Sequence, residues 1–143
     1  MIEPGVEELL RGAGLRITGP RVAVLSVIRQ HPHIDVGTIV DLVRERAGAV
    51  STQAVYDVLK VLVAADLARR IDLPNSPARY EAQAGDEHQH VVCRTCGRIS
   101  DVGGPQPAVR LEPSQDHGFA IDGVEVTYWG RCPQCQAASA PAG

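Results

Sequence analysis

The sequence has no long apolar run, no excess of basic residues and no cysteine outside two Cys-x-x-Cys pairs. No stretch approaches the roughly 20 apolar residues of a transmembrane helix, so we expect no membrane association. The N-terminus, Met1-Ile-Glu-Pro-Gly, lacks the basic segment and apolar run of a signal peptide, and we expect a cytoplasmic protein. The 143 residues suit one domain or two small ones.

Motifs of the common enzyme classes are also absent. The chain shows no glycine-rich phosphate loop, no Ser-His-Asp order and no nucleophile elbow. We therefore expect neither an enzyme nor a small-molecule substrate. Two other classes stay open: a thiol oxidoreductase that uses one Cys-x-x-Cys pair, and a zinc-bound protein-interaction module that does not bind DNA.

The formal net charge of −3 is unevenly distributed. Up to Tyr80 there are ten Arg and Lys against nine Asp and Glu, and from Glu81 onward there are four against eight. Bulk charge therefore does not indicate nucleic-acid binding, and any DNA contact depends on a few well-placed basic residues. The acidic second half suits cations.

Apolar residues recur at helical spacing four times in the first half. Gly14 ends the first expected helix, Thr18 or Gly19 caps a second that begins at Pro20, Asp35 caps a third, and Ser51 caps a fourth. Two extended runs, 67–73 and 78–81, flank a Pro-Asn turn and predict a β-hairpin. Four helices followed by a hairpin predict a winged helix-turn-helix domain over residues 1–80.

A polar stretch at 81–87 predicts a hinge, and the pattern then becomes β-rich. The β-favouring segments are 90–93, 99–102, 119–121 and 124–129, which predict a sheet of three or four strands over residues 88–136. Residues 137–143 are small and are expected to form a disordered tail. The predicted fold class is α+β, with a small C-terminal β-rich domain.

All four cysteines belong to two pairs, Cys93 with Cys96 and Cys132 with Cys135. In a reducing compartment such pairs indicate zinc more often than disulfides. Four thiolates complete a tetrahedral site with no open position, so this zinc is predicted to be structural.

Histidines and carboxylates suggest a second metal site. His88 and His90 alternate along an expected strand and point to one face, where Glu81 and Asp101 could complete a shell for Fe²⁺, Mn²⁺ or Zn²⁺. The alternative is an exposed pair of histidines on a loop edge that bind no metal ion. His31 and His33 form a further pair, with helix-end residues as the alternative.

Candidate DNA contacts lie on the fourth helix and before the second. They could reach phosphates or base edges, with solvated surface residues as the alternative. The candidates are Arg16, Arg21, Thr52, Gln53, Tyr56 and Lys60.

Taken together, these segments resemble the ferric uptake regulator (Fur) family of dimeric, metal-responsive bacterial repressors. The matching motifs are Gly14-Leu-Arg-Ile-Thr, Pro20-Arg21, Val50-Ser-Thr-Gln-Ala-Val-Tyr-Asp-Val-Leu, Ala78-Arg-Tyr-Glu, Glu87-His-Gln-His-Val-Val-Cys-Arg-Thr-Cys-Gly, His117-Gly-Phe and Tyr128-Trp-Gly-Arg-Cys-Pro-Gln-Cys. Within the family the chain looks most like the actinobacterial catalase-peroxidase repressors. That resemblance implies a homodimer on pseudo-palindromic operator DNA, with the second domain as the dimerisation domain.

The resemblance also assigns residues to sites. It implies structural zinc on the four cysteines and a regulatory Fe²⁺ or Mn²⁺ on His33, Glu81, His88, His90 and Asp101. Release by hydrogen peroxide would follow from oxidation of His33 and His88 beside bound iron. The alternative is an iron, zinc or nickel uptake regulator of the same fold that does not sense peroxide.

Several positions depart from the family pattern. Glu81 stands where the peroxide sensors it resembles carry aspartate. Gln89 and Val124 replace usual ligands of an additional metal site, to which His117 could still contribute. Asp57 stands where a basic or amide residue is common, so we expect a different operator.

Overall fold

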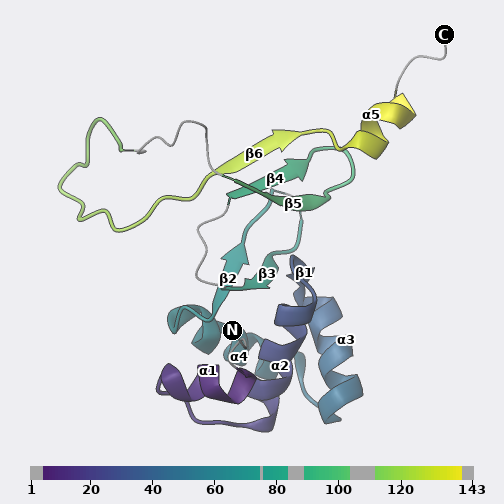
Figure 1. The fold of residues 1–143 in the computed structure, drawn as a ribbon, viewed down its shortest axis with the longest axis vertical. Helices are drawn as coiled ribbons and strands as arrows, with labels where there is room; N and C mark the ends of the chain where they lie inside the picture. The colour runs from purple at the N-terminus through teal and green to yellow at the C-terminus, as the bar shows by residue number, and fades with distance from the viewer. Residues whose placement is uncertain (1–4, 75, 84–88, 104–111, 140–143) are drawn as a thin grey trace. The chain divides into compact units, whose positions relative to one another are not determined.

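The computed structural model describes residues 5–74, 76–83, 89–103 and 112–139. The chain divides into two compact units, Met1–Gly85 and Asp86–Gly143, which we call the N-terminal unit and the C-terminal unit. Figure 1 shows helices α1 to α4 in the first and strands β4 to β6 in the second. Helices and strands occur in both, which confirms the α+β class.

The N-terminal unit is a winged helix. Its elements are α1 (Val6–Gly12), α2 (Gly19–Gln30), β1 (Ile34–Asp35), α3 (Val36–Ala47), α4 (Thr52–Ala64), β2 (Ala68–Ile71) and β3 (Arg79–Ala82). The four predicted helices and the hairpin are confirmed. Strand β1 was not predicted: it pairs antiparallel with β3, so the sheet order is β1-β3-β2.

Side-chain caps fix where three of these helices begin. Thr18 accepts a hydrogen bond from the Arg21 backbone N–H at 3.2 Å, and Ser51 accepts one from Ala54 at 3.0 Å. Asp35 accepts from both the backbone N–H and the hydroxyl of Thr38, at 2.8 and 3.0 Å. Each cap satisfies a backbone donor that has no partner within its helix, as the sequence predicted.

The core of the N-terminal unit is formed by the apolar faces of the helices. Helix α2 packs on α3, α4 and β3, and Tyr80 of β3 adds its ring to the same core. The largest fully buried side chains are Leu10, Leu25, Ile28, Ile39, Leu59 and Leu62. This packing leaves the opposite face of α4 exposed.

The Asp35 cap predicts a pH-dependent stability. The Thr38 backbone N–H holds the pKa of Asp35 below its usual range, so the stabilisation is present above the unfolded pKa of about 4 and is lost as pH falls through the lower folded pKa. At pH 7, Asp35→Ala is expected to cost about 1 kcal/mol. Thermal unfolding followed by helical circular dichroism measures this.

The same helix offers a control for this substitution. Asp41→Ala, an exposed position on α3, should change stability little. A difference between wild type and Asp35→Ala that stayed constant down to the lowest accessible pH would contradict the assignment of the cap to an ionised carboxylate.

The C-terminal unit is a three-stranded sheet followed by a short helix. Its elements are β4 (Gln89–Cys93), β5 (Ile99–Val102), β6 (Thr127–Gly130) and α5 (Pro133–Ser139). Central β4 pairs antiparallel with β5 and parallel with β6. Of its described side chains only those of His90, Val92 and Cys93 are buried, so the described part of this unit has a very small core.

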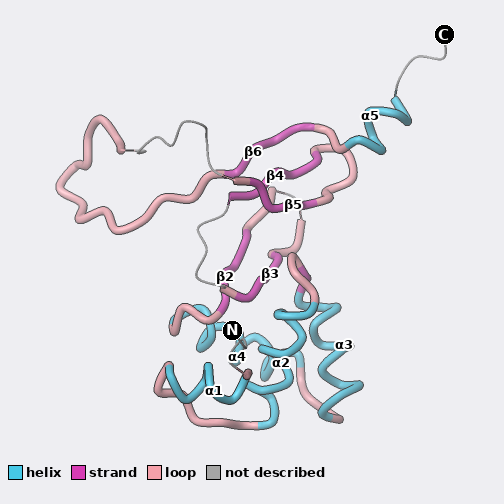
Figure 2. The backbone as a smooth tube through the Cα atoms, in the orientation of Figure 1, coloured by secondary structure: helices cyan, strands magenta, loops and turns pink. Residues whose placement is uncertain are grey.

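Three boundary predictions were wrong. Residues 119–121 form no strand and lie in the loop before β6, since Phe119 and Ile121 are exposed and find no partner strand (Figure 2). Residues 137–139 continue α5, which Pro133 starts and alanines favour, so the prediction of a disordered tail is wrong for these three residues; 140–143 lie outside the described residues. Glu81 belongs to strand β3 because its backbone pairs with β2, so it is not a hinge residue.

Among the described residues no single helix is long and apolar enough to cross a membrane. Helices α3 and α4 reach the length and apolar composition of a membrane span only when they are taken together, and they are bent by 102° at the break between them.

Candidate metal centres and DNA-binding face

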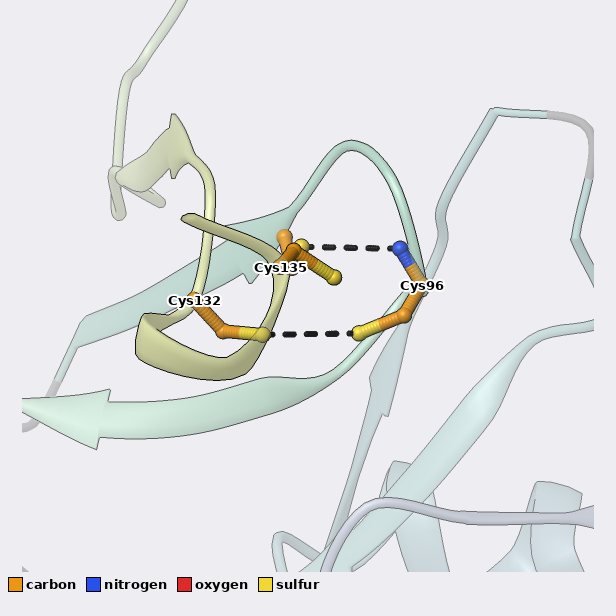
Figure 3. Close-up of side chains that lie close together, drawn as sticks. Cys96, Cys132 and Cys135 are labelled. Carbon is orange, nitrogen blue, oxygen red and sulfur yellow. Dashed lines mark hydrogen bonds between the residues drawn. The ribbon is translucent and has the colours of Figure 1, made fainter. Parts of the chain in front are cut away.

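The two Cys-x-x-Cys pairs converge on one point. The Sγ atoms of Cys93, Cys96, Cys132 and Cys135 all lie within 4.8 Å of one another, and no disulfide joins them. The Cys96 and Cys132 sulfurs are 3.7 Å apart (Figure 3). Zinc–sulfur bonds of about 2.3 Å in a tetrahedron require about 3.8 Å between sulfurs. The four thiols therefore fit a tetrahedral metal ion.

The turn geometry brings these sulfurs together. Parallel pairing of β4 with β6 ends at Cys93 opposite Gly130, which sets the two pairs side by side. Gly97 has a φ of 79°, a left-handed conformation that closes the first turn and that other residues rarely adopt. Helix α5 begins at Pro133 and carries Cys135 in its first turn.

The thiols do not share one ionisation state. Backbone N–H groups, first that of Cys132 and then that of Cys96, lower the pKa of Cys93 to about 5. The neighbouring thiols of Cys132 and Cys93 raise the pKa of Cys135 to about 12. Like charges so close cannot all form without a cation, so the cluster is built to receive one.

A pair of possible metal ligands, one histidine and one carboxylate, lies in the N-terminal unit. The Nε2 atom of His33 is 3.2 Å from Oε2 of the buried Glu81. Strand β1 creates this proximity, since Ile34 pairs with Tyr80, the neighbour of Glu81. His33 itself has a φ of 62°, and its carbonyl accepts a hydrogen bond from Arg79 at 3.3 Å. A constrained turn thus aims the imidazole at the carboxylate.

A second histidine–carboxylate pair lies in the C-terminal unit. His90 on β4 and Asp101 on β5 are directly opposite in the antiparallel register, and Nε2 lies 3.4 Å from Oδ1. The imidazole is buried, whereas Asp101 is half-exposed. His88 falls outside the described residues. His117 belongs to no group of three or more converging donors in the described part of the chain.

The sequence reasoning missed one charged residue beside these donors. Arg69 on β2 pairs in register with Glu81, and its Nη1 atom lies 3.8 Å from Oε1. The predicted hairpin could have shown this, because residues directly opposite in an antiparallel pair have adjacent side chains. Its register, however, depends on a turn that includes Pro74 and Pro77, which the sequence pattern alone does not fix.

The DNA-contact candidates of α4 share its exposed face. Thr52, Gln53, Tyr56 and Lys60 are all exposed, and Tyr56 retains 42% of its accessible surface. The amide nitrogen of Gln53 donates to the Asp57 carboxylate at 2.9 Å, one turn along the helix. This polar face lies opposite the buried Val55, Val58, Leu59 and Leu62.

Arg16 and Arg21 lie beside that helix. They line one hollow together with Ala54 and Asp57 of α4. Arg21 donates from Nη1 to the Arg16 carbonyl at 2.9 Å, so its guanidinium is directed toward the loop before α2. The Arg16 side chain is exposed.

Residues 12–129 match the sequence model of the Ferric uptake regulator family. The chain belongs to this family. It is therefore a metal-dependent transcriptional regulator of the Fur family and not an enzyme.

Curated Fur relatives match almost the whole chain. The transcriptional regulator FurA of Mycobacterium tuberculosis is 51% identical over 135 residues, which cover 92% of this chain and 90% of FurA. Ferric uptake regulation protein 2 of Mycolicibacterium fortuitum is 50% identical over 138 residues, which cover 92% of this chain and 93% of that protein. These matches confirm the resemblance to the Fur family inferred from the motifs.

Solved structures confirm the fold. The ferric uptake regulator Fur of Helicobacter pylori superposes with a TM-score of 0.71 at 22% identity, covering 92% of this chain and 89% of that chain. At this identity the match shows the shared architecture of winged helix and β-rich unit.

Proposed function

We propose that the protein is a dimeric repressor that binds pseudo-palindromic operator DNA through α4 and releases it when a regulatory metal ion is lost or its histidine ligands are oxidised by hydrogen peroxide. The observation that carries this proposal is the exposed polar face of α4 within a winged helix of a Fur-family chain. A helix in this position enters the major groove, and the β2–β3 hairpin lies along the backbone.

The side chains of α4 suit base recognition. Tyr56 and Gln53 offer hydrogen-bonding groups to base edges, while the exposed Thr52 and Lys60 are proposed to contact phosphates. Arg16 and Arg21 add positive charge beside the start of α4. The negative charge of Asp57 on the same face weakens the attraction of one α4 helix to DNA. A dimer that presents two such helices supplies electrostatic attraction that one copy lacks.

Exposed apolar residues of the C-terminal unit support a second copy of the chain as its partner. Phe119, Ile121 and Val124 retain 75, 53 and 65% of their accessible surface, and Tyr128 and Trp129 are also exposed. So many apolar side chains on so small a unit are typical of an interface. We infer that residues 88–136 form the dimerisation domain.

Zinc is the proposed occupant of the cysteine cluster. A closed set of four sulfurs at tetrahedral spacing leaves no position for a substrate, which supports a structural role. Convergence of the pairs on each other also argues against the thiol oxidoreductase alternative, which needs one pair accessible to a disulfide substrate.

By the family resemblance, the regulatory ion is proposed to bind His33, Glu81, His90 and Asp101. The His33–Glu81 pair and the His90–Asp101 pair each combine nitrogen with oxygen donors, a set that suits Fe²⁺ or Mn²⁺. His88 is proposed to complete the set. An ion that binds the DNA-competent state of the protein more favourably than the other state would promote DNA binding. Such a repressor acts where the DNA is, in the cytoplasm.

A binding assay tests the repressor function. Zinc-loaded full-length protein is mixed with a pool of pseudo-palindromic duplexes, with Mn²⁺ and with a chelator. We expect retention of duplex only with the added ion, and affinity that falls steeply with salt. Tyr56→Ala should weaken the selected duplex, whereas Glu45→Ala on α3 should not. Equal retention with and without the ion would sink the proposal.

The more specific part of the proposal is that hydrogen peroxide causes the release of DNA. By resemblance, Fe²⁺ at the site would direct peroxide chemistry to His33 and His88. We expect iron-loaded protein to gain oxygen at these histidines, by peptide mass spectrometry, and to release DNA, while manganese-loaded protein does neither. Retention of DNA by iron-loaded, peroxide-treated protein with unmodified histidines would favour the alternative, a metal uptake regulator without peroxide sensing.

A further inference from the structure

The two carboxylate oxygens of Glu81 have different neighbours. Oε2 faces the imidazole of His33 at 3.2 Å, and Oε1 faces the guanidinium of Arg69 at 3.8 Å. All three side chains belong to the N-terminal unit. The carboxylate therefore lies between an imidazole, which can bind a metal ion, and a guanidinium, which is always positively charged.

Strand register makes this arrangement persistent. Arg69 and Glu81 are directly opposite in the β2–β3 pair, and the Arg69 side chain retains 28% of its accessible surface against 5% for Glu81. A buried carboxylate is costly without a charged or hydrogen-bonding partner, so the ion pair with Arg69 favours one orientation of Glu81.

We propose that Arg69 is a positioning residue for the regulatory metal site. It holds Oε1 of Glu81, so that Glu81 presents a single oxygen, Oε2, on the side of His33, and its charge lowers the affinity of the site for a divalent cation. This inference rests on the proposed function, since it assumes that His33 and Glu81 are ligands.

Two physical effects follow from that placement. A carboxylate held at one oxygen leaves one more coordination position open to water than a chelating carboxylate does. The guanidinium also offsets part of the negative charge that attracts the ion, and a like charge several ångströms away in a partly buried site opposes binding. Both effects act on metal binding itself and do not require DNA.

Cobalt(II) titration of zinc-loaded, full-length protein tests the proposal, because visible absorbance reports both affinity and coordination number. Arg69→Met removes the charge and keeps an unbranched side chain. We expect it to bind Co²⁺ about tenfold more tightly than wild type and with weaker absorbance, as Glu81 becomes bidentate. Arg69→Lys keeps the charge and should return the affinity toward wild type.

Arg70→Met is the matched control. Arg70 is the next residue of β2, is exposed, and pairs with Asp72 at 2.8 Å rather than with Glu81. It should leave both the affinity and the spectrum unchanged. Helical circular dichroism of each variant verifies folding.

The outcomes separate the two proposals. If wild type binds a cobalt ion in addition to its zinc and Arg69→Met binds cobalt with the same affinity and spectrum, or more weakly, the role of Arg69 is overturned and the regulatory site stands. If zinc-loaded wild type binds no cobalt ion, the regulatory site and the role of Arg69 are both overturned.

Discussion

Cys132→Ser is expected to abolish zinc binding and to unfold the C-terminal unit while the N-terminal helices persist. Three sulfurs remain, and the described part of this unit buries only three side chains, so its packing cannot replace the metal. Structural zinc contributes about 10–16 kcal/mol in small zinc-bound peptides at neutral pH, which is folding free energy when no site exists in the unfolded chain.

The single tryptophan reports on this unit alone. Trp129 lies on β6, three residues before Cys132, and the Arg94 guanidinium lies 5.0 Å from its ring centroid. We expect its emission to shift to longer wavelength in Cys132→Ser, zinc to fall to zero by metal analysis, and the helical signal of α1 to α4 to remain. Loss of the dimer should accompany these changes.

A change in the same turn provides the control. Gln134→Ser keeps all four cysteines and removes one exposed hydrogen bond, donated by Arg98 at 2.7 Å. It should retain one zinc per chain and the wild-type emission. Full zinc occupancy in Cys132→Ser with unchanged emission would refute the structural role of the cluster.

The winged helix could be predicted because its signals are local. Thr18, Asp35 and Ser51 cap helices within three residues of themselves, and apolar spacing then defines the buried faces. Strand β1 could not, since two residues carry no periodicity and their strand character comes from pairing with β3, more than 40 positions later.

Prediction of the C-terminal unit was less complete because its structure depends on pairing and on metal. Residues 119–121 favour strands by composition, yet a strand requires a partner, and the sheet is filled by β4, β5 and β6. The cysteine cluster was predicted correctly, since its spacing directly encodes ligand geometry.

The regulatory residues came largely from family resemblance. Sequence spacing suggested His90 with Asp101, and the structure places them opposite each other. The approach of His33 to Glu81 depends on β1 and on the turn that Arg79 stabilises, neither of which a local pattern reveals. The position of Glu81 within β3, rather than in a hinge, gives it a fixed orientation.

Glu81→Gln is expected to remove metal-dependent DNA binding while leaving the fold intact. The amide keeps the size of the side chain but loses the charge and the anionic oxygen that would ligate the ion. Changes to outer-shell residues alone cost about 10–100-fold in metal affinity, so loss of a ligand should weaken Mn²⁺ binding by at least about 100-fold. Calorimetric titration and the duplex-retention assay measure the two consequences.

Two further variants complete this test. Glu81→Asp keeps the carboxylate on a shorter side chain, and we expect weaker but measurable Mn²⁺ binding together with DNA retention at high Mn²⁺. Glu45→Ala removes an exposed carboxylate of the same unit and should bind Mn²⁺ like wild type. The thermal midpoint of metal-free Glu81→Gln must stay close to that of wild type, because the amide keeps the size of the side chain and its polar contact with His33. Wild-type Mn²⁺ affinity in a folded Glu81→Gln variant would contradict the proposal that Glu81 is a ligand of the regulatory ion.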